Sequence, residues 1–178
     1  MATKKFTIES NKSTIEWLGK KVTGAHNGTI DIADGILTLT DGKFSGGQFT
    51  IATDSIKILD VTDPGTNAQF AGHLASDDFF STEKYPTATL EITSVSHGTD
   101  TAYHVAGNLT IKGITHPIEF DAEVANIEGD TLRASGKIVI DRTKYGMKFR
   151  SGNFFKDLGD TLIFNDFTLN VRLTAKAA

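Results

Sequence analysis

Apolar and polar residues alternate with a period of two through most of this 178-residue chain. In STIEWLGKK, for example, Ile15 and Trp17 alternate with Thr14 and Glu16. This period is typical of β-strands with one buried face. About eight strands with short connections, and no rhythm of strands alternating with helices, predict an all-β fold, either a sandwich or a barrel, in one domain over residues 1–178. The later strands are expected at 86–96, 101–112, 114–127, 131–142 and 160–175.

Turn signals divide the first part of the sequence. GTIDIADGILTLTDG predicts two strands joined by a hairpin at Ala33-Asp34-Gly35, because Asp-Gly is a strong hairpin-turn signal, and Asp41-Gly42 offers a second turn. The apolar phase then changes between Phe44 and Phe49. Because a one-residue slip turns every following side chain over, we expect a bulge at Gly46-Gly47. The 17 glycines of the chain suit the bends of a closed barrel.

One segment breaks the strand pattern. DPGTNAQFAGHLAS has its apolar residues at helical spacing. Asp63 can cap a helix, and Pro64 suits the first helical position. The spacing therefore predicts one short α-helix over residues 65–76.

Composition excludes several classes of protein. The formal charge of −4, with both signs scattered along the chain, argues against a general nucleic-acid binder. The absence of cysteine excludes disulfides, thiolate metal sites and cysteine nucleophiles. No apolar run approaches the roughly 20 residues of a membrane-spanning helix. The start, MATKKFTIES, has no apolar h-region, so the chain as it stands is expected in the cytoplasm, whereas loss of a leader peptide would imply a periplasmic or secreted protein. A homodimer is compatible with the sequence.

The stretch HLASDDFFSTEKYPTATLEI raises the question of a catalytic site. His73, Asp77 and Asp78 could supply metal ligands, or an acid and a base. We favour a simpler interpretation, in which His73 ends the helix and the two aspartates cap the next turn. No H-E-x-x-H, G-x-S-x-G or phosphate-binding glycine motif is present. We therefore expect no metal and no catalytic residue.

A second stretch, DRTKYGMKFRSGNFF, interleaves basic and apolar residues. Its basic residues are even-numbered, and Tyr145, Met147 and Phe149 are odd-numbered, so an extended chain would present cations on one face. Two interpretations stay open: a cationic rim that holds an anionic headgroup, or an ordinary solvated face. The candidate headgroup contacts are Arg142, Lys148 and Arg150.

Phenylalanine dominates the aromatic residues, with twelve against three tyrosines and one tryptophan. Several lie in the expected helix and irregular segments and could cover one end of a barrel: Phe70, Phe79, Phe80, Phe154 and Phe155. An eight-stranded barrel is either filled by its own side chains or holds one small ligand. The sequence alone does not distinguish these two cases.

Three stretches together carry a family resemblance. HLASDDFFSTEKYPTATLEI, GNLTIKGITHPIEF and DRTKYGMKFRSGNFF resemble, in order, the most recognisable stretches of the YceI-like family, and the similarity extends over about residues 5–175. Leu90 stands where an aromatic residue is common. The resemblance implies a lipocalin-like antiparallel barrel with a short helix. It also implies a long apolar cavity for an amphiphile such as a quinone, a prenyl phosphate or a fatty-acid amide, without established catalytic residues.

These observations together predict non-catalytic binding, storage or transport of an isoprenoid-type lipid. Burial of hydrocarbon needs only a dry tube of suitable bore. Strand phase and segment position give the candidate ligand contacts: Trp17, Phe49, Ile51, Phe70, Leu74, Phe79, Phe80, Leu90, Ile92, Phe120, Phe164 and Leu169. Two alternatives remain: an enzyme that uses His73 with Asp77, and a solid-core barrel that acts through protein partners.

Overall fold

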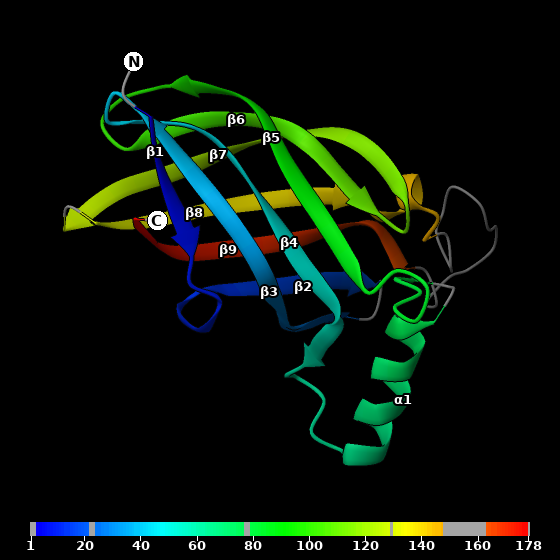
Figure 1. Ribbon diagram of the computed structural model, residues 1–178. Helices are drawn as coiled ribbons and strands as arrows, with labels where there is room; N and C mark the ends of the chain where they lie inside the picture. The colour runs from blue at the N-terminus through cyan, green and yellow to red at the C-terminus, as the bar shows by residue number, and fades with distance from the viewer. Residues whose placement is uncertain (1–2, 22–23, 77–78, 129, 148–162, 178) are drawn as a thin grey trace.

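The chain folds into an antiparallel β-barrel with one α-helix, as the sequence predicts (Figure 1). The computed structural model describes residues 3–21, 24–76, 79–128, 130–147 and 163–177. The strands are β1 (Thr3–Ile8), β2 (Thr14–Lys21), β3 (Gly24–Thr40), β4 (Lys43–Ile58), β5 (Thr87–His97), β6 (Ala102–Ile111), β7 (Ile114–Glu128), β8 (Thr131–Asp141) and β9 (Ile163–Ala177). The helix is α1 (Pro64–Ala75), and two 3₁₀ helices are η1 (Ser10–Lys12) and η2 (Arg142–Tyr145).

The barrel closes because β1 and β2 share one strand position between β3 and β9. β2 pairs with residues 24–30 of β3 and with residues 163–172 of β9. β1 continues that position, pairing with residues 36–40 of β3 and 175–177 of β9. The remaining strands follow in the order β9-β8-β7-β6-β5-β4-β3, each antiparallel to its neighbour. Closure of this kind gives each of the described strands a neighbour on both sides.

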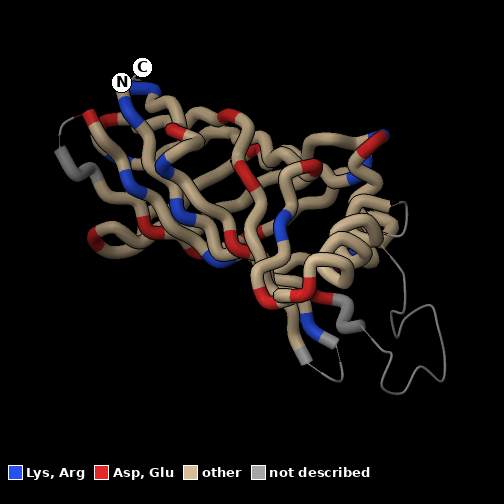
Figure 2. The backbone as a smooth tube through the Cα atoms, turned by 90° about the horizontal axis from the view of Figure 1, so that it is seen from below, with Lys and Arg blue, Asp and Glu red and all other residues tan. Residues whose placement is uncertain are grey.

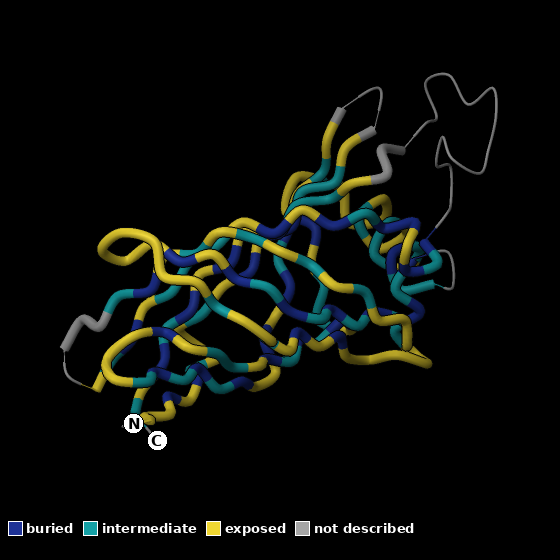
Figure 3. Tube along the Cα trace, turned by 90° about the horizontal axis from the view of Figure 1, so that it is seen from above, coloured by how far each residue is buried: buried dark blue, intermediate teal, exposed yellow. Residues whose placement is uncertain are grey.

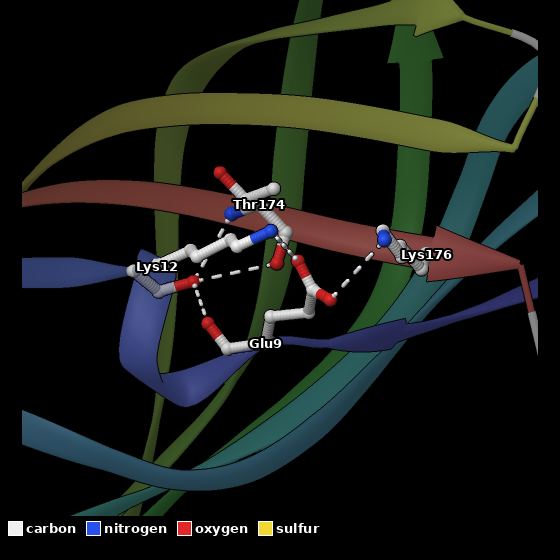
Figure 4. Close-up of polar contacts among 5 residues, drawn as sticks. Glu9, Lys12, Thr174 and Lys176 are labelled. Atoms are coloured by element: carbon white, nitrogen blue, oxygen red, sulfur yellow. Dashed lines mark hydrogen bonds and ion pairs between the residues drawn. The ribbon is translucent and has the colours of Figure 1, made fainter.

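A polar clasp joins the break between β1 and β2 to β9 (Figure 4). On the side that faces β1 and β2, Thr174 lies opposite the break and has no strand partner, whereas on its other side it pairs with Arg133 of β8. Its carbonyl accepts a hydrogen bond from the Glu9 amide at 2.8 Å, and its own amide donates to Ser13 Oγ at 3.0 Å. Lys12 and Lys176 lie 3.5 and 3.9 Å from the Glu9 carboxylate. These contacts replace the missing ladder bonds, so the backbone polar groups stay satisfied.

The expected hairpin at Ala33-Asp34-Gly35 is wrong. These residues lie inside the long strand β3, where Ile32 pairs with Ile51 and Asp34 with Thr50, so Ala33 is the extra residue of a bulge. A Cβ atom at Gly35 would lie 2.5 Å from Phe49 Cβ, so this glycine permits close approach of the neighbouring strand and does not form a turn.

Two further predictions for this region are confirmed: the turn at Asp41-Gly42 and the bulge at Gly46-Gly47. Asp41 and Gly42 both have positive φ, 53° and 81°, and form the two-residue hairpin between β3 and β4. Thr38 pairs with Gly46 while Leu39 pairs with Phe44, which leaves a bulge beside the glycine pair.

Helix α1 begins one residue earlier than predicted and lies at one end of the barrel, whereas both chain termini lie at the other end (Figure 1). Asp63 caps it by accepting a hydrogen bond from the Thr66 amide at 2.8 Å. The Asn67 side chain donates to the carbonyls of Ile58 and Val61, both at 3.0 Å, which ties the helix to the end of β4. Among the described residues, no helix has both the length and the apolar character needed to span a membrane.

Candidate functional site

The interior of the barrel has two halves that differ in how they are filled. Buried and exposed residues alternate along the strands, so every strand presents a row of side chains to the interior (Figure 3). We call the half next to the termini the closed half and the half next to α1 the open half. The row on β8 passes from one to the other through Leu132, Ile138 and Ile140.

Large side chains fill the closed half. Phe6 is fully buried, and the Phe44 and Tyr103 rings pack edge to face with centroids 5.7 Å apart. A gap of about 40 Å³ lies in this half, and Leu37 and Phe49 are among the described residues around it. This density is typical of a protein core.

The open half contains a cavity of about 660 Å³ bounded by described residues. This volume lies within the usual range of ligand pockets, about 300–1,000 Å³. The strands line it with the next inward layer of apolar side chains: Trp17, Ile30, Ile51, Leu109, Ile111, Ile140 and Leu169.

Small side chains account for the hollow. Inward positions in the open half carry Gly19 on β2, Thr53 on β4 and Ala88 on β5. A Cβ atom added to Gly19 would have no heavy atom within 4 Å. The closed half has aromatic rings at inward positions, whereas these small residues leave space in the open half. A void forms where the summed volume of the inward side chains is smaller than the space inside the barrel.

Aromatic residues from α1 and the following turn form one wall of the cavity. Phe70 packs edge to face against Trp17 and His26, with ring centroids 6.4 and 4.7 Å apart. Phe80 packs similarly against Phe167 of β9 at 6.2 Å. Leu74 and Phe79 line the same cavity, and both are 8% exposed. The structure thus brings together, at one end of the barrel, three of the phenylalanines suggested for that position and the candidate ligand contact Leu74.

The strand residues suggested for ligand contact divide between the two halves. Trp17, Ile51 and Leu169 line the cavity. Phe49, Ile92 and Phe120 border the small gap of the closed half, and Leu90 is 1% exposed within the core. Strand phase identifies an inward residue, but it does not tell how far along the barrel axis the interior is filled. Ile30, Thr53, Ala88 and Leu109 also line the cavity but were missed. The signal for Thr53 and Ala88 was a small residue at an inward position, and the signal for Ile30 and Leu109 was strand phase.

Some suggested residues cannot be placed. Asp77, Asp78, Lys148, Arg150, Phe154 and Phe155 lie outside the described residues, as does the side chain of Phe164. Ligand or headgroup contact by Phe164, Lys148 and Arg150 stays a prediction. So do capping of the turn by the two aspartates and cover of the barrel end by the two phenylalanines.

Arg142 is the buried cation of the cavity wall. Its side chain lines the cavity and the residue is only 3% exposed. One guanidinium nitrogen, Nη1, donates to the Met147 carbonyl at 2.7 Å, and Cζ lies 5.7 Å from the centroid of the Phe79 ring. Burial lowers the pKa of the guanidinium to about 10, although the charge of Asp141 acts in the opposite direction. The group therefore stays protonated near neutral pH.

The expected extended chain at the start of DRTKYGMKFRSGNFF is wrong for residues 142–145, which form η2. Asp141 accepts a hydrogen bond from the Thr143 amide at 3.0 Å and so caps a turn, and Gly146 ends that turn with φ of 76°. As a result Tyr145 is buried, while Lys144 is exposed on the surface. Even and odd positions therefore do not separate cations from apolar residues in this turn.

A polar cluster lies beside His26, which lines the cavity. His26 Nδ1 and Asp60 Oδ2 lie 2.8 Å apart, and the Asn27 amide donates to Asp60 Oδ1 at 3.1 Å. Burial would raise the pKa of Asp60, but the hydrogen bonds from Asn27 and His26 outweigh it and lower the pKa. Charged residues of both signs are spread along the barrel (Figure 2).

His73 lies on the cavity wall near the end of α1. Its carbonyl accepts a hydrogen bond from the Ser76 amide at 3.1 Å, and its ring packs edge to face on Phe79 with centroids 5.0 Å apart. Across the part of the chain that the structure describes, no group of three or more histidine, aspartate or glutamate side chains is arranged to hold a metal ion.

Fold and cavity together define a lipocalin-like class of protein: a closed antiparallel barrel with an apolar interior cavity at one end. Within that class, the pattern described as the YceI-like domain matches residues 6–175, and the chain belongs to this family. It is 32% identical to Protein YceI of Escherichia coli O157:H7 over 121 residues, and 33% identical to a UPF0312 protein of Photorhabdus laumondii over 128 residues. Each match covers 67% of this chain and 62% of the relative, so the chain spans less than two thirds of these curated relatives.

Solved structures share the fold over nearly the whole chain. Burkholderia cenocepacia BcnA superposes with a TM-score of 0.77 and 22% identity, over 95% of this chain and 99% of its own. A polyisoprenoid binding domain from Saccharophagus degradans, implicated in plant cell wall breakdown, gives 0.72 and 14% identity, over 97% and 98% of the two chains. At these identities the likeness establishes the common architecture.

Proposed function

We propose that this protein binds an amphiphilic lipid of the isoprenoid type in the open half of its barrel, and that it carries or stores the lipid without transforming it. The observation that carries the proposal is the cavity of about 660 Å³ with a wall made mainly of aliphatic and aromatic side chains. A cavity of this kind accepts a hydrocarbon chain without specific polar contacts.

The energetics favour a long apolar tail. Removal of apolar surface from water contributes roughly 25 cal/mol per Å². Part of that gain is offset by the lost freedom of the flexible tail. A branched and partly unsaturated isoprenoid chain has fewer rotatable bonds to order than a saturated chain of equal length. The same wall would also hold the tail of a quinone, a prenyl phosphate or a fatty-acid amide.

The positions of the polar residues in the cavity wall favour one orientation of the bound ligand. Thr66, Gln69 and His73 come from α1, and Lys20 and Asp166 lie at strand ends next to it. The opposite end of the cavity meets the packed closed half. An amphiphile would therefore keep its head near α1 and direct its tail toward the closed half. The description of the Saccharophagus relative as a polyisoprenoid binding domain supports the proposed ligand class.

Native mass spectrometry of the purified full chain, followed by analysis of the extracted lipid, tests the proposal. We expect a non-covalent adduct that yields an isoprenoid-type lipid, with the same mass before and after prolonged incubation with the protein. Protein with no adduct that also fails to bind added isoprenoid lipids would overturn the proposal. A change in the lipid's mass would instead indicate an enzyme.

A pair of glycine substitutions provides the matched control. Gly19→Leu places a side chain in the cavity, and Gly72→Leu places the same side chain on the exposed face of α1. A Cβ atom at either position meets no heavy atom within 4 Å, so both variants should fold. We expect Gly19→Leu to lose the adduct and Gly72→Leu to keep it. Retention of wild-type lipid levels by Gly19→Leu would contradict the assignment of the cavity.

A further inference from the structure

His26 lies on the inward face of β3, across the ladder from a glycine. It pairs with Gly19 of β2, and both residues line the cavity. A Cβ atom built at Gly19 would have no heavy atom within 4 Å, so the space on that side of the histidine is open. The imidazole also packs edge to face on Phe70, with ring centroids 4.7 Å apart. The ring is therefore part of the cavity wall and has open space beside it.

Asp60 determines which nitrogen of His26 carries the proton. Desolvation acts to raise the pKa of Asp60, but hydrogen bonds from Asn27 and His26 outweigh it and lower the pKa, so the side chain is a carboxylate that only accepts hydrogen bonds. Its Oδ1 accepts from the Asn27 backbone amide at 3.1 Å. Its Oδ2 lies 2.8 Å from His26 Nδ1, which must therefore be the protonated nitrogen. In the neutral ring, Nε2 then has a free lone pair and is an acceptor.

This second nitrogen of His26 is open. Among the described residues, Nε2 has no hydrogen-bond partner. Asp60 is not among the described residues that line the cavity, whereas His26 is, so the ring extends from the carboxylate to the cavity. The two nitrogens of an imidazole point in diverging directions, which leaves Nε2 on the side away from Asp60. When an apolar tail displaces water from the cavity, a ligand that supplies a donor restores the hydrogen bond that Nε2 made to water.

Other polar groups of the wall are already used within the protein. Trp17 Nε1 donates to the Lys57 carbonyl at 3.0 Å, and Thr53 Oγ1 donates to the Tyr85 carbonyl at 2.6 Å. Both donors hold the fold together and are not available to a ligand. His26 differs from them because its one hydrogen bond fixes the ring and leaves the other nitrogen unused.

We propose that His26 Nε2 accepts a hydrogen bond from the headgroup of the lipid, so that the protein prefers amphiphiles whose head carries an uncharged O–H or N–H donor. Asp60 is the positioning residue that keeps Nε2 an acceptor. This inference rests on the proposed function. It narrows the ligand class by favouring alcohols, hydroquinones and amides over quinones, esters and ethers with the same tail.

The test compares matched ligand pairs on delipidated wild-type protein: farnesol against farnesyl methyl ether, and palmitamide against N,N-dimethylpalmitamide. Titrations are run at about pH 8.5, well above the pKa of about 6.5 of imidazole in water. Trp17, the only tryptophan of the chain, lines the cavity, so its fluorescence reports binding. We expect the ligand with the donor to bind about 3- to 10-fold more tightly in at least one pair, as one neutral hydrogen bond provides. The pair with the larger ratio identifies hydroxyl or amide as the preferred head.

Two variants assign the preference to His26 and Asp60. His26→Phe keeps a ring against Phe70 but removes the acceptor, so affinity for the ligand with the donor should fall to that of its partner. In Asp60→Asn, the Asn27 backbone amide keeps the side-chain oxygen on its own side and so directs the new amino group at His26 Nδ1. Nε2 then carries the proton and donates. The ligand without a donor should rise to the affinity of its partner, because both have an oxygen that accepts.

His104→Phe is the matched control. His104 also pairs with an aspartate, Asp121 at 2.9 Å, but it lies on the outer surface and is not among the described residues of the cavity wall. This variant should keep the wild-type preference. Nuclear magnetic resonance of nitrogen-labelled histidine gives a second measurement. We expect an unprotonated Nε2 at His26 in wild-type protein and a protonated one in Asp60→Asn.

The possible results distinguish this inference from the proposed function. Equal binding of both members of both pairs by wild-type protein would overturn the role of His26 and leave lipid binding intact. A preference unchanged in His26→Phe, or in Asp60→Asn if His26→Phe does not fold, would also overturn it, as would a proton on Nε2 in wild-type protein. Absence of binding by all four ligands would instead count against the proposed function.

Discussion

The closed and open halves of this barrel are built from the same strands with the same alternation, yet one is a core and the other a cavity. β4 contributes Phe49 to the closed half and then Ile51 and Thr53 to the open half. β9 contributes Leu173 to the closed half and Leu169 to the open half. The difference lies in the sum of inward volumes at each level of the barrel. Alternation therefore determines which side chains face the interior, whereas side-chain size determines where the interior is hollow.

This division assigns stability and binding to different parts of one sheet. In the closed half, aromatic and aliphatic side chains interdigitate, and the polar clasp around Thr174 joins β1, β2 and β9. Dense packing of this kind supplies much of the free energy of folding. The open half can then keep a cavity, because its strands are continuous with a well-packed end.

Truncation of leucine should show the largest difference between the halves. Leu37 in the closed half and Leu109 in the open half are both 2% exposed. We expect Leu37→Ala to lower the free energy of unfolding of delipidated protein by about 3–5 kcal/mol, because it creates a new void in packed surroundings. Leu109→Ala should lower it by about 2–3 kcal/mol, since one side of this residue already faces a cavity. Urea denaturation measures both, and equal losses would show that the halves are packed alike.

Enlargement of alanine should again destabilise the closed half more than the open half, but only in the open half should it weaken lipid binding. Ala88 lines the cavity, whereas Ala175 is fully buried in the closed half. Ala88→Leu has room and should change the free energy of unfolding by less than about 1 kcal/mol while weakening lipid binding about 10-fold or more. Ala175→Leu overpacks the core and should lose about 1–3 kcal/mol with lipid affinity unchanged. Binding titrations and denaturation of both variants check this, and a loss of affinity in Ala175→Leu alone would contradict the division.

Acid should weaken the open half through Asp60. Its pKa lies below the ordinary value of 3.8, because hydrogen bonds from Asn27 and His26 outweigh the effect of burial. The stabilising contribution is therefore fully present above pH about 4 and is lost as the pH falls through the lowered pKa. Asp60→Asn should be less stable than wild type at pH 6 by less than about 1 kcal/mol. The difference should shrink toward pH 2, and a difference that is constant with pH would exclude titration of Asp60 as its cause.

A rise in pH should have the smallest effect on stability. It should act on the outer surface of the closed half, through His104. His104 pairs with Asp121 at 2.9 Å, and this hydrogen bond, with the nearby charges of Glu119 and Asp121, outweighs desolvation and raises the pKa of the histidine. Its contribution is present below the ordinary pKa of 6.5 and is lost as the pH rises through the raised value. Nuclear magnetic resonance titration of the ring should give a higher pKa in wild type than in Asp121→Asn. Identical values would rule out this pair as the source of the shift.

Much of the fold could be predicted from the sequence because alternation and turn chemistry act locally. The Asp41-Gly42 hairpin and the Asp63 cap follow from residues adjacent to each feature. The Ala33-Asp34-Gly35 segment misled because Asp-Gly also tolerates a bulge. Its role depends on Phe49 of the neighbouring strand, which approaches Gly35 closely. Contacts between strands are not visible in one stretch of sequence.

The candidate site could be predicted only in part, for a related physical reason. The apolar wall from α1 followed from helical spacing, and Phe70 and Leu74 both line the cavity. The depth at which each strand crosses the hollow depends on register around the whole barrel. Strand phase therefore also selected Phe49, which borders the small gap of the closed half, and Leu90, which is 1% exposed and is not among the described residues that line the cavity. The sequence did not identify Ala88, because a small residue indicates a cavity only when the sizes of the neighbouring inward side chains are known.

The position of a bound lipid tests the central claim most directly. Nuclear Overhauser effects between a bound prenyl chain and methyl-labelled protein would locate the tail residue by residue. The account predicts contacts from the tail to the methyl groups of Ile51, Ile140 and Leu169 in the open half, and none to Leu37 or Leu173 in the closed half. A tail that contacts the closed-half methyl groups, or that contacts neither set, would contradict it.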